Sequence, residues 1–369
     1  MLFSESFWVG KKVLVTGHTG FKGSWLCLWL HQLGAEVTGY GLEPKTMPNL
    51  FTVARISEVC RSVIGDIRNR ELLLQTLHEV KPEIIIHMAA QSLVRYSYQN
   101  PVETFEVNVM GTVNLLDAVR EAFLNQVSIR SVLNVTTDKC YENREWVWGY
   151  RESDVLGGYD PYSNSKACSE LITSSYRNSF FDPRNYEKDV PIIATARAGN
   201  VIGGGDWSND RIVPDSIRAL TGGAKLVVRN PSAIRPWQHV LEPLSGYLLL
   251  SQAMYEQGNG YAGAWNFGPV IESEQNVAWI VERIGDYWDS KDFFTMQTTT
   301  NLHESMQLRL DSSKARQRLG WVPKWNLETG LRHTLDWYWA YQHQADMQKA
   351  SKEQIESFMA LDWVKTQNP

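Results

Sequence analysis

Tyr162 and Lys166 are two residues of this chain whose types and spacing could support chemistry. They are four residues apart in a stretch, 159–180, that is predicted to be a helix, so both side chains project from one face. The same pattern is also typical of an exposed helical pair. A glycine-rich turn and a polar strand end elsewhere in the chain favour the chemical interpretation.

The polar strand end is the second candidate. Residues 131–142 are predicted to form a buried strand that ends in Thr136, Thr137, Asp138 and Lys139. Packing does not explain four polar residues there, whereas ligands bind at the carboxyl edge of a doubly wound sheet. The alternative for Asp138 and Lys139 is an ordinary ion pair.

The glycine-rich turn joins a predicted strand over 12–16 to a helix that starts near Ser24. A helix N-terminus attracts anions, and glycines allow a pyrophosphate to approach the backbone, so the turn predicts a dinucleotide site. A tight structural turn with the same glycines is the alternative. His18 stands where a small residue would fit more easily, and we expect it to loosen the pyrophosphate contact. The predicted cofactor-binding residues of this turn are Gly17, His18, Thr19, Gly20, Phe21, Lys22 and Gly23.

The adenosine end of the predicted site is less regular. The second strand, 35–42, ends in Tyr40-Gly41-Leu42 without the acid that usually binds the adenosine ribose. Lys45 follows this strand, so NADP is an alternative cofactor. The third strand, 61–66, ends in Asp66, followed by Ile67. Asp66 can accept a hydrogen bond from the adenine amino group or cap a helix over 69–80.

Two further stretches border the site. The fourth predicted strand, 82–94, runs into Ala89 and Ala90, which are small enough for a cofactor to lie across the strand end. Asn108 interrupts a helical stretch over 101–122. It either satisfies buried backbone groups near the site or takes part in simple helix packing.

The alternation of strands and helices up to residue 207 predicts an α/β fold, a doubly wound parallel sheet covered on both faces. A smaller, interwoven substrate domain is predicted to follow. The predicted boundaries are 1–196 with parts of 236–268 for the dinucleotide-binding domain, and 197–235 with 269–369 for the substrate domain.

Composition excludes several classes of function. The chain has 369 residues, 43% of them hydrophobic, and a net charge of -5 without a basic stripe, so we expect no nucleic-acid partner. No apolar run is long enough to span a membrane and no signal peptide is recognisable, so cytoplasm is expected. Four scattered cysteines predict reduced thiols and no metal site. Because the net charge is negative, a negatively charged substrate would need local cations to bind it. The candidates for contacts with a diphosphate are Arg211, Arg235 and Arg309. For each of them, an ordinary surface position is the alternative.

Six stretches carry a family resemblance. In order, TGHTGFKG, HMAAQS, TTDKCY, YSNSK, RAGNVIGGGDW and LGWVP resemble the nucleotide-sugar 4,6-dehydratases of the extended short-chain dehydrogenase/reductase family, over about residues 10–340. GHTGFKGSWL and the Asp138-Lys139 pair are most similar to the branch that acts on CDP-glucose, since the dTDP-glucose and GDP-mannose enzymes carry Asp-Glu or Thr-Glu pairs.

The resemblance implies bound NAD, a nucleotide-sugar substrate, a role in deoxysugar and O-antigen biosynthesis, and a homodimer or homotetramer. Its subunit contact would be a four-helix bundle from 100–123 and 160–180. A dehydratase or 4-epimerase acting on a dTDP-, GDP- or UDP-sugar is the nearest alternative. A non-catalytic NAD-sensing module is a more distant one.

The resemblance also implies individual roles. Tyr162, its pKa lowered by Lys166, takes the C4 hydroxyl proton while Thr137 bonds the same oxygen. Lys139 removes the C5 proton and protonated Asp138 expels the C6 hydroxyl; alternatively, Lys139 is an electrostatic partner and His239 or water is the base. Further cofactor contacts are Asp66, Ile67, Ala89, Ala90, Gln91, Thr136, Tyr162 and Lys166. The implied substrate contacts are Gln91, Ser92, Asn200, Arg211, Arg235 and Arg309.

Overall fold

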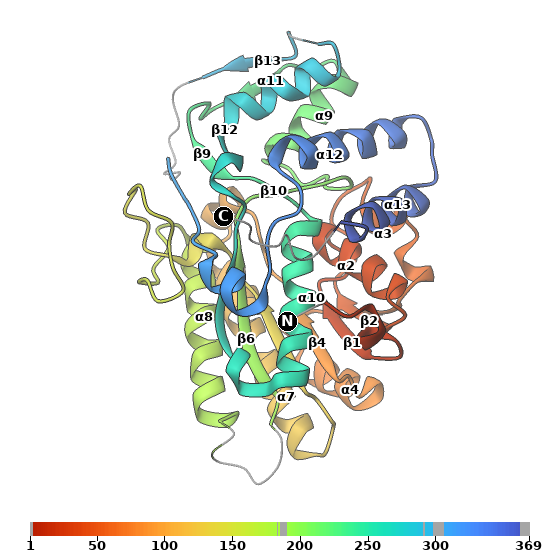
Figure 1. The fold of residues 1–369 in the computed structure, drawn as a ribbon, viewed down its shortest axis with the longest axis vertical. Coiled ribbons are helices and arrows are strands. Elements are labelled where there is room, and N and C mark those ends of the chain that lie inside the picture. The colour runs from red at the N-terminus through yellow and green to blue at the C-terminus, as the bar shows by residue number, and fades with distance from the viewer. Residues whose placement is uncertain (1–2, 183, 185–189, 291, 298–305, 362–369) are drawn as a thin grey trace.

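A seven-stranded parallel sheet forms the centre of the computed structural model, which describes residues 3–182, 184, 190–290, 292–297 and 306–361. The strand order is β11-β6-β5-β4-β1-β2-β3, and the doubly wound α/β fold is thereby confirmed (Figure 1). The strands are β1 (Lys12–Thr16), β2 (Glu36–Gly41), β3 (Arg61–Ile64), β4 (Ile84–His87), β5 (Ser131–Val135), β6 (Ile192–Ala198) and β11 (Gly263–Phe267).

Alternate residues of the central strands fill two separate hydrophobic cores. Val13 and Val15 of β1 belong to the larger core, whereas Leu14 belongs to the second one. Because successive side chains of a strand point to opposite faces, the sheet needs helices on both sides. Helices α2 (Phe21–Gln32) and α10 (Leu241–Gln257) contribute to the first core; α4 (Arg70–Val80), α7 (Gly111–Leu124) and α8 (Pro161–Phe180) cover the other face.

The helical stretch predicted over 101–122 is divided by a wide turn. It consists of α6 (Pro101–Phe105), a π-helical turn (Glu106–Met110) and α7. Asn108 in that turn accepts a hydrogen bond from the backbone N–H of Gln91 at 2.8 Å and donates to its carbonyl oxygen at 2.9 Å. It also donates to Ser165 of α8 at 2.8 Å. The first of the two alternatives for Asn108, satisfaction of buried backbone groups, is therefore confirmed.

Smaller elements cover the carboxyl edge of the sheet, in the upper part of Figure 1. They include three two-stranded sheets and two helices. The pairs are β7 (Val201–Ile202) with β10 (Gln238–His239), β9 (Ile234–Pro236) with β12 (Glu274–Asn276), and β8 (Leu226–Val228) with β13 (Phe294–Met296). The helices are α9 (Ile212–Gly222) and α11 (Val277–Tyr287).

The last two helices return toward the start of the chain. They are α12 (Leu327–Gln342) and α13 (Met347–Met359). The indole N–H of Trp29 in α2 donates to the sulfur of Met359 at 3.1 Å. The predicted boundary assigns 269–369 to the substrate domain. It therefore places α13 and its packing partner α2 in different domains.

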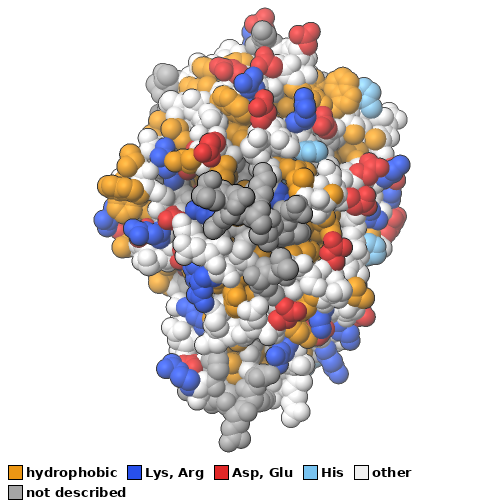
Figure 2. Space-filling model, in the orientation of Figure 1, with side chains coloured by type: hydrophobic (Ala, Val, Ile, Leu, Met, Phe, Trp, Pro, Cys, Tyr) orange, Lys and Arg blue, Asp and Glu red, His pale blue; other side chains and the backbone are white. Residues whose placement is uncertain are grey.

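The visible surface mixes charges of both signs, as Figure 2 shows. Within the part of the chain that the structure describes, no helix has both the length and the apolar character required to cross a membrane.

We expect Asn108→Ala to lower the free energy of unfolding by about 2 kcal/mol, because it leaves buried backbone groups of Gln91 without partners. Urea unfolding monitored by circular dichroism measures the change. Gln75→Ala, which removes an exposed amide from α4, is the control and should change stability by less than about 0.5 kcal/mol. Equal stabilities of the two variants would contradict this role of Asn108.

Candidate active site

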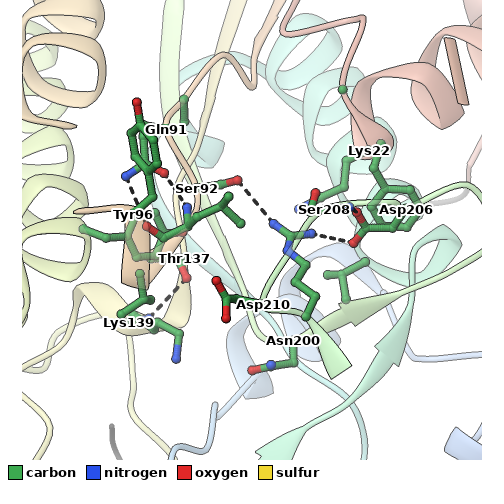
Figure 3. Close-up of a pocket in the computed structure, with 18 of the residues that line it drawn as sticks. Lys22, Gln91, Ser92, Tyr96, Thr137, Lys139, Asn200, Asp206, Ser208 and Asp210 are labelled. Carbon is green, nitrogen blue, oxygen red and sulfur yellow. Dashed lines mark hydrogen bonds and ion pairs between the residues drawn. The ribbon is translucent and has the colours of Figure 1, made fainter. Parts of the chain in front are cut away.

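A cavity of about 1150 Å³ runs along the carboxyl edge of the main sheet, below the smaller elements. Of the predicted site residues, all but His18 and Arg309 line it. Figure 3 shows Gln91, Thr137 and Lys139 on one side of the view and Lys22 and Asp206 on the other. Residues more than 100 positions apart in the sequence thus face one space.

The glycine turn is built for close backbone approach. Gly17 has a φ of +78°, and a Cβ on it would lie 2.7 Å from the backbone nitrogen of Ala89. A Cβ on Gly23 would lie 2.1 Å from the carbonyl oxygen of Gly17. Only glycine fits at either position, and the N-terminus of α2 faces the cavity through Phe21 and Lys22. The turn therefore fits the pyrophosphate of a dinucleotide.

His18 does not belong to the cavity, contrary to the sequence-based prediction. Its fully buried imidazole points toward the neighbouring strands, where Nε2 lies 2.7 Å from the hydroxyl of Ser62. The space exists because Gly39 has no side chain: a Cβ there would lie 2.1 Å from the His18 ring. His18 thus does not crowd a pyrophosphate. Burial lowers the pKa of His18 to about 4.

At the adenosine end, the structure rules out one of the two roles for Asp66. Helix α4 is capped by Asn69, which accepts the backbone N–H of Leu72 at 3.0 Å. Asp66 lines the cavity and pairs with Arg68 at 2.6 Å, so an adenine contact remains the prediction. Glu43, two residues beyond β2, also lines the cavity. The sequence did not single out Glu43, because the ribose-binding acid is expected at the end of the predicted strand, and that strand ends at Leu42.

Asp138 is a buried acid with an unsatisfied oxygen. Its side chain is 1% exposed, and its Oδ1 accepts the hydroxyl of Thr137 at 3.0 Å. Its Oδ2 has no hydrogen-bond partner among the described residues. A Cβ on Gly199 would lie 3.2 Å from this oxygen, so the glycine leaves room beside it. Burial raises the pKa of Asp138 above its ordinary value, although Lys139 and Arg235 oppose the shift.

Tyr162 and Lys166 share one face of α8, as predicted, but their electrostatics differ from the expectation. Burial raises the pKa of Tyr162 to about 12; a hydrogen bond with Thr137 and the charge of Arg211 oppose this. Lys166 donates to the carbonyl oxygen of Val135 at 3.2 Å, and burial lowers its own pKa to about 8. The expected lowering of the Tyr162 pKa by Lys166 is therefore wrong for this structure, because desolvation of the phenol dominates.

A buried ion pair supports α8 from within. Glu170, one turn after Lys166, pairs with Arg197 at 2.8 Å, and each side chain is 3% exposed. Glu170 also accepts hydrogen bonds from Thr136 and Thr195. Sequence reasoning missed Glu170, although its four-residue spacing from Lys166 was the available signal.

The predicted substrate residues divide into two groups. Arg211 faces the cavity and donates to Asp206 at 2.8 Å and to Ser92 at 3.2 Å. Asn200 and Arg235 line the same cavity. Arg309 instead pairs with Glu274 at 2.9 Å and donates to the carbonyl of Val147. This placement argues against a phosphate contact from Arg309.

Two arginines that the sequence did not single out also line the cavity. Arg229 pairs with Asp210 at 2.9 Å, and the Nε of Arg95 lies 3.7 Å from the same carboxylate. The three residues come from separate segments, so no local pattern indicated them. The cavity thus offers several guanidinium groups to a phosphorylated ligand.

Comparisons with known proteins agree with this architecture. The family model described as GDP-mannose 4,6 dehydratase matches residues 14–334. A CDP-glucose 4,6-dehydratase of Salmonella typhimurium strain LT2 is 49% identical over 97% of this chain and 99% of its own length. A dTDP-glucose 4,6-dehydratase of Xanthomonas campestris is 26% identical over 88% of this chain and 92% of its own length.

Solved structures share the fold. The dTDP-glucose 4,6-dehydratase DesIV of Streptomyces venezuelae, crystallised with NAD, has a TM-score of 0.76 at 24% identity and covers 91% of this chain and 99% of its own. An NAD-bound UDP-glucose-4-epimerase of Stenotrophomonas maltophila has a TM-score of 0.78 at 21% identity, with coverages of 91% and 100%. The chain belongs to the GDP-mannose 4,6 dehydratase family of nucleotide-sugar enzymes.

We expect the stability contributed by His18 to depend on pH. The pKa of His18 is about 4 in the folded protein, against an ordinary value of 6.5. Between pH 6.5 and pH 4 the unfolded chain therefore binds a proton at His18 that the folded chain does not. Stability is therefore lost as pH falls through this window, by about 1.4 kcal/mol per pH unit. The stability advantage of wild type over His18→Asn should shrink by about 2 kcal/mol between about pH 7.5 and about pH 5.

Urea unfolding at the two pH values measures this difference. His343→Asn, which changes an exposed imidazole, is the control. An advantage over His18→Asn that does not vary with pH would contradict the buried, neutral imidazole.

Proposed function

We propose that this chain is an NAD-dependent dehydratase that converts CDP-glucose to CDP-4-dehydro-6-deoxyglucose and water. The observation that carries the proposal is the convergence of a buried carboxyl group, an amine and a phenol, from Asp138, Lys139 and Tyr162, on one cavity. The 49% identity to a CDP-glucose 4,6-dehydratase supports the choice of nucleotide. The product would supply deoxysugar biosynthesis, including that of O-antigen lipopolysaccharide.

The cavity has residues suited to hold NAD at both ends. The pyrophosphate would lie against the glycine turn at Gly17, Gly20 and Gly23; side chains added at Gly17 or Gly23 would have no room. The adenosine would lie near Asp66 and Ile67, and the nicotinamide end near Tyr162 and Lys166. Bound NAD would supply the hydride acceptor for oxidation at C4 and the hydride donor for reduction at C6.

Tyr162 would exchange a proton with the C4 hydroxyl, and Thr137 would hold the same oxygen by a hydrogen bond. The nearby charge of Arg211 favours the phenolate, because it lowers the pKa that burial raises. Lys166 holds the carbonyl of Val135 and so fixes the strand end against α8.

Asp138 and Lys139 would remove water from the 4-ketone. Because burial raises the pKa of Asp138, its carboxyl group can retain a proton to donate to the leaving C6 hydroxyl. Lys139 would take the C5 proton, made acidic by the neighbouring ketone. The C5–H and C6–O bonds break, a C5=C6 double bond forms and one water leaves. His239 is a poor alternative base, since it is 2% exposed, does not line the cavity, and packs edge-to-face against Trp325.

Turnover of a panel of CDP-, dTDP-, UDP- and GDP-glucose tests the function. The proposal expects CDP-glucose to be converted fastest, with a product lighter by one water. A product of unchanged mass and inverted C4 would establish a 4-epimerase instead. Faster dehydration of another nucleotide would retain the reaction but overturn the substrate.

We also propose a homodimer or homotetramer assembled through a four-helix bundle from 100–123 and 160–180. Exposed hydrophobic side chains on these helices support it. Val102, Met110 and Leu171 are 70%, 50% and 59% exposed, and a subunit contact would remove such apolar surface from water.

Lys139→Met should stop the reaction after oxidation at C4, because methionine cannot accept the C5 proton. We expect overall turnover to fall by about 10²- to 10⁴-fold, the usual effect of losing a general base. In a single turnover in D₂O, reduced nicotinamide should accumulate by absorbance while C5 retains its hydrogen.

Lys349→Met, which changes an exposed lysine of α13, is the control and should turn over normally. If Lys139→Met still exchanged the C5 hydrogen at the rate of product formation, Lys139 would be only an electrostatic partner of Asp138.

A further inference from the structure

Glu170 is a buried acid that connects the helix and the strand that carry the reacting groups. It lies one turn after Lys166 on α8, and its side chain is 3% exposed. One carboxylate oxygen accepts a hydrogen bond from the hydroxyl of Thr136, the residue that follows β5. The other oxygen accepts hydrogen bonds from Thr195 at 2.7 Å and from Arg197 at 2.8 Å, both on β6. The acid therefore fixes α8 against two neighbouring strands.

A second contact between α8 and β5 lies one turn earlier on the helix. The ammonium of Lys166 donates to the carbonyl oxygen of Val135, the last residue of β5. Side chains of α8 thus hold both Val135 and Thr136, and the next residue along the chain is Thr137. Tyr162 lies on the same helix. The two contacts therefore set where Thr137 lies relative to Tyr162.

Glu170 is also a carboxylate whose charge acts on Lys166. Burial lowers the pKa of Lys166 to about 8, and the charge of Glu170 opposes this shift. Although burial opposes ionisation of Glu170, Arg197 and the hydrogen bonds from Thr136 and Thr195 hold the pKa of Glu170 below its ordinary value. The acid is therefore ionised near neutral pH.

The other titratable groups around Lys166 do not supply this attraction. They are Tyr162 on α8, His87 on β4, Cys140 in the turn after β5 and Lys22 on α2. Burial shifts the pKa values of the phenol, the imidazole and the thiol so that each group is uncharged near pH 7. The ammonium of Lys22 repels that of Lys166. Near neutral pH, Glu170 is thus the anion of this group.

We propose that Glu170 is a positioning residue for the reaction: its carboxylate ties the strand end before Thr137 to α8 and keeps Lys166 in its charged form. This inference rests on the proposed function. A charged Lys166 would stabilise the negative charge that develops on the C4 oxygen, whereas a neutral amine would not. Glu170 does not line the cavity, so it acts through Thr136 and Lys166.

The titration of Lys166 tests the inference without turnover. Lysine labelled with ¹³C at Cε reports the protonation of each amine by NMR, and Lys166→Arg identifies the signal of Lys166. This signal should titrate near pH 8 in the wild type. In Glu170→Gln the midpoint should fall by about one to two pH units, the effect of removing one charge about 8 Å away at an effective dielectric constant of about 20. Glu170→Asp retains the charge and should titrate close to the wild type.

The pH dependence of CDP-glucose turnover provides a second readout. In the wild type, kcat should fall as pH rises through about 8, because Lys166 loses its proton. In Glu170→Gln this fall should occur about one to two pH units lower, a shift that a merely structural role would not produce. Thr136→Val breaks the tie but keeps the charge, so it should lower kcat without moving the fall.

Glu71→Gln, which neutralises an exposed carboxylate of α4, is the control and should change neither readout. If Glu170→Gln does not fold because the buried Arg197 loses its partner, the double variant Glu170→Gln/Arg197→Met removes both charges and carries the same expectation.

An unchanged ¹³C midpoint in the folded variant would overturn the inference, as would a shifted midpoint with an unmoved fall of kcat. Wild-type kcat in Thr136→Val would overturn the tie. These results would leave the proposed function intact, because the substrate panel tests it separately. A wild type that converts none of the four nucleotide sugars would overturn the proposed function and, with it, the role of Glu170 in the reaction.

Discussion

The buried carboxyl group of Asp138 is the constraint on which the site depends. Leaving an oxygen of a buried polar group unsatisfied costs about 1–3 kcal/mol, so the surrounding fold must hold it in place. Thr137 bonds one oxygen, and Gly199 leaves space beside the other. The sheet can hold this group because β5 is an interior strand, paired on both sides with β4 and β6. An acid that must keep its proton until a leaving group arrives requires such an environment.

The cations around this acid suit a negatively charged substrate. The chain as a whole carries a net charge of -5, yet Lys22, Lys166, Arg211 and Arg235 all line one cavity. Desolvation lowers the pKa of Lys22 and of Lys166, and this limits how much positive charge the fold must bury. A diphosphate would find several guanidinium groups within this space. The same positive field would stabilise an enolate formed next to a C4 ketone.

Features set by local pattern could be predicted from the sequence. The glycine turn, the strand ends and the pairing of Tyr162 with Lys166 follow from short-range spacing. Their convergence follows because parallel strands end at one edge of the sheet. The orientation of His18 could not be predicted, since it depends on the missing side chain of Gly39 in the next strand. The ion pair that takes Arg309 to Glu274 likewise joins distant segments.

Electrostatic outcomes were the least predictable part. The pKa of Tyr162 reflects burial by several elements. Lys166, the cation nearest to Tyr162 in sequence, does not determine this pKa. Asn108 shows the opposite case, because a polar residue within a helical stretch already indicated that it could satisfy buried backbone groups, with simple helix packing as the alternative. The structure supplied the partner, Gln91, and the π-helical turn that brings the two together.

Transfer of deuterium within one substrate molecule tests the central claim most directly. CDP-glucose labelled with deuterium at C4 is mixed with CDP-glucose labelled with ¹³C at C6, and the product is analysed by mass spectrometry and NMR. The account predicts deuterium at C6 of the 4-keto-6-deoxy product, with no molecule carrying both labels. Deuterium lost to solvent, retained at C4, or found together with ¹³C would contradict an internal hydride transfer at this site.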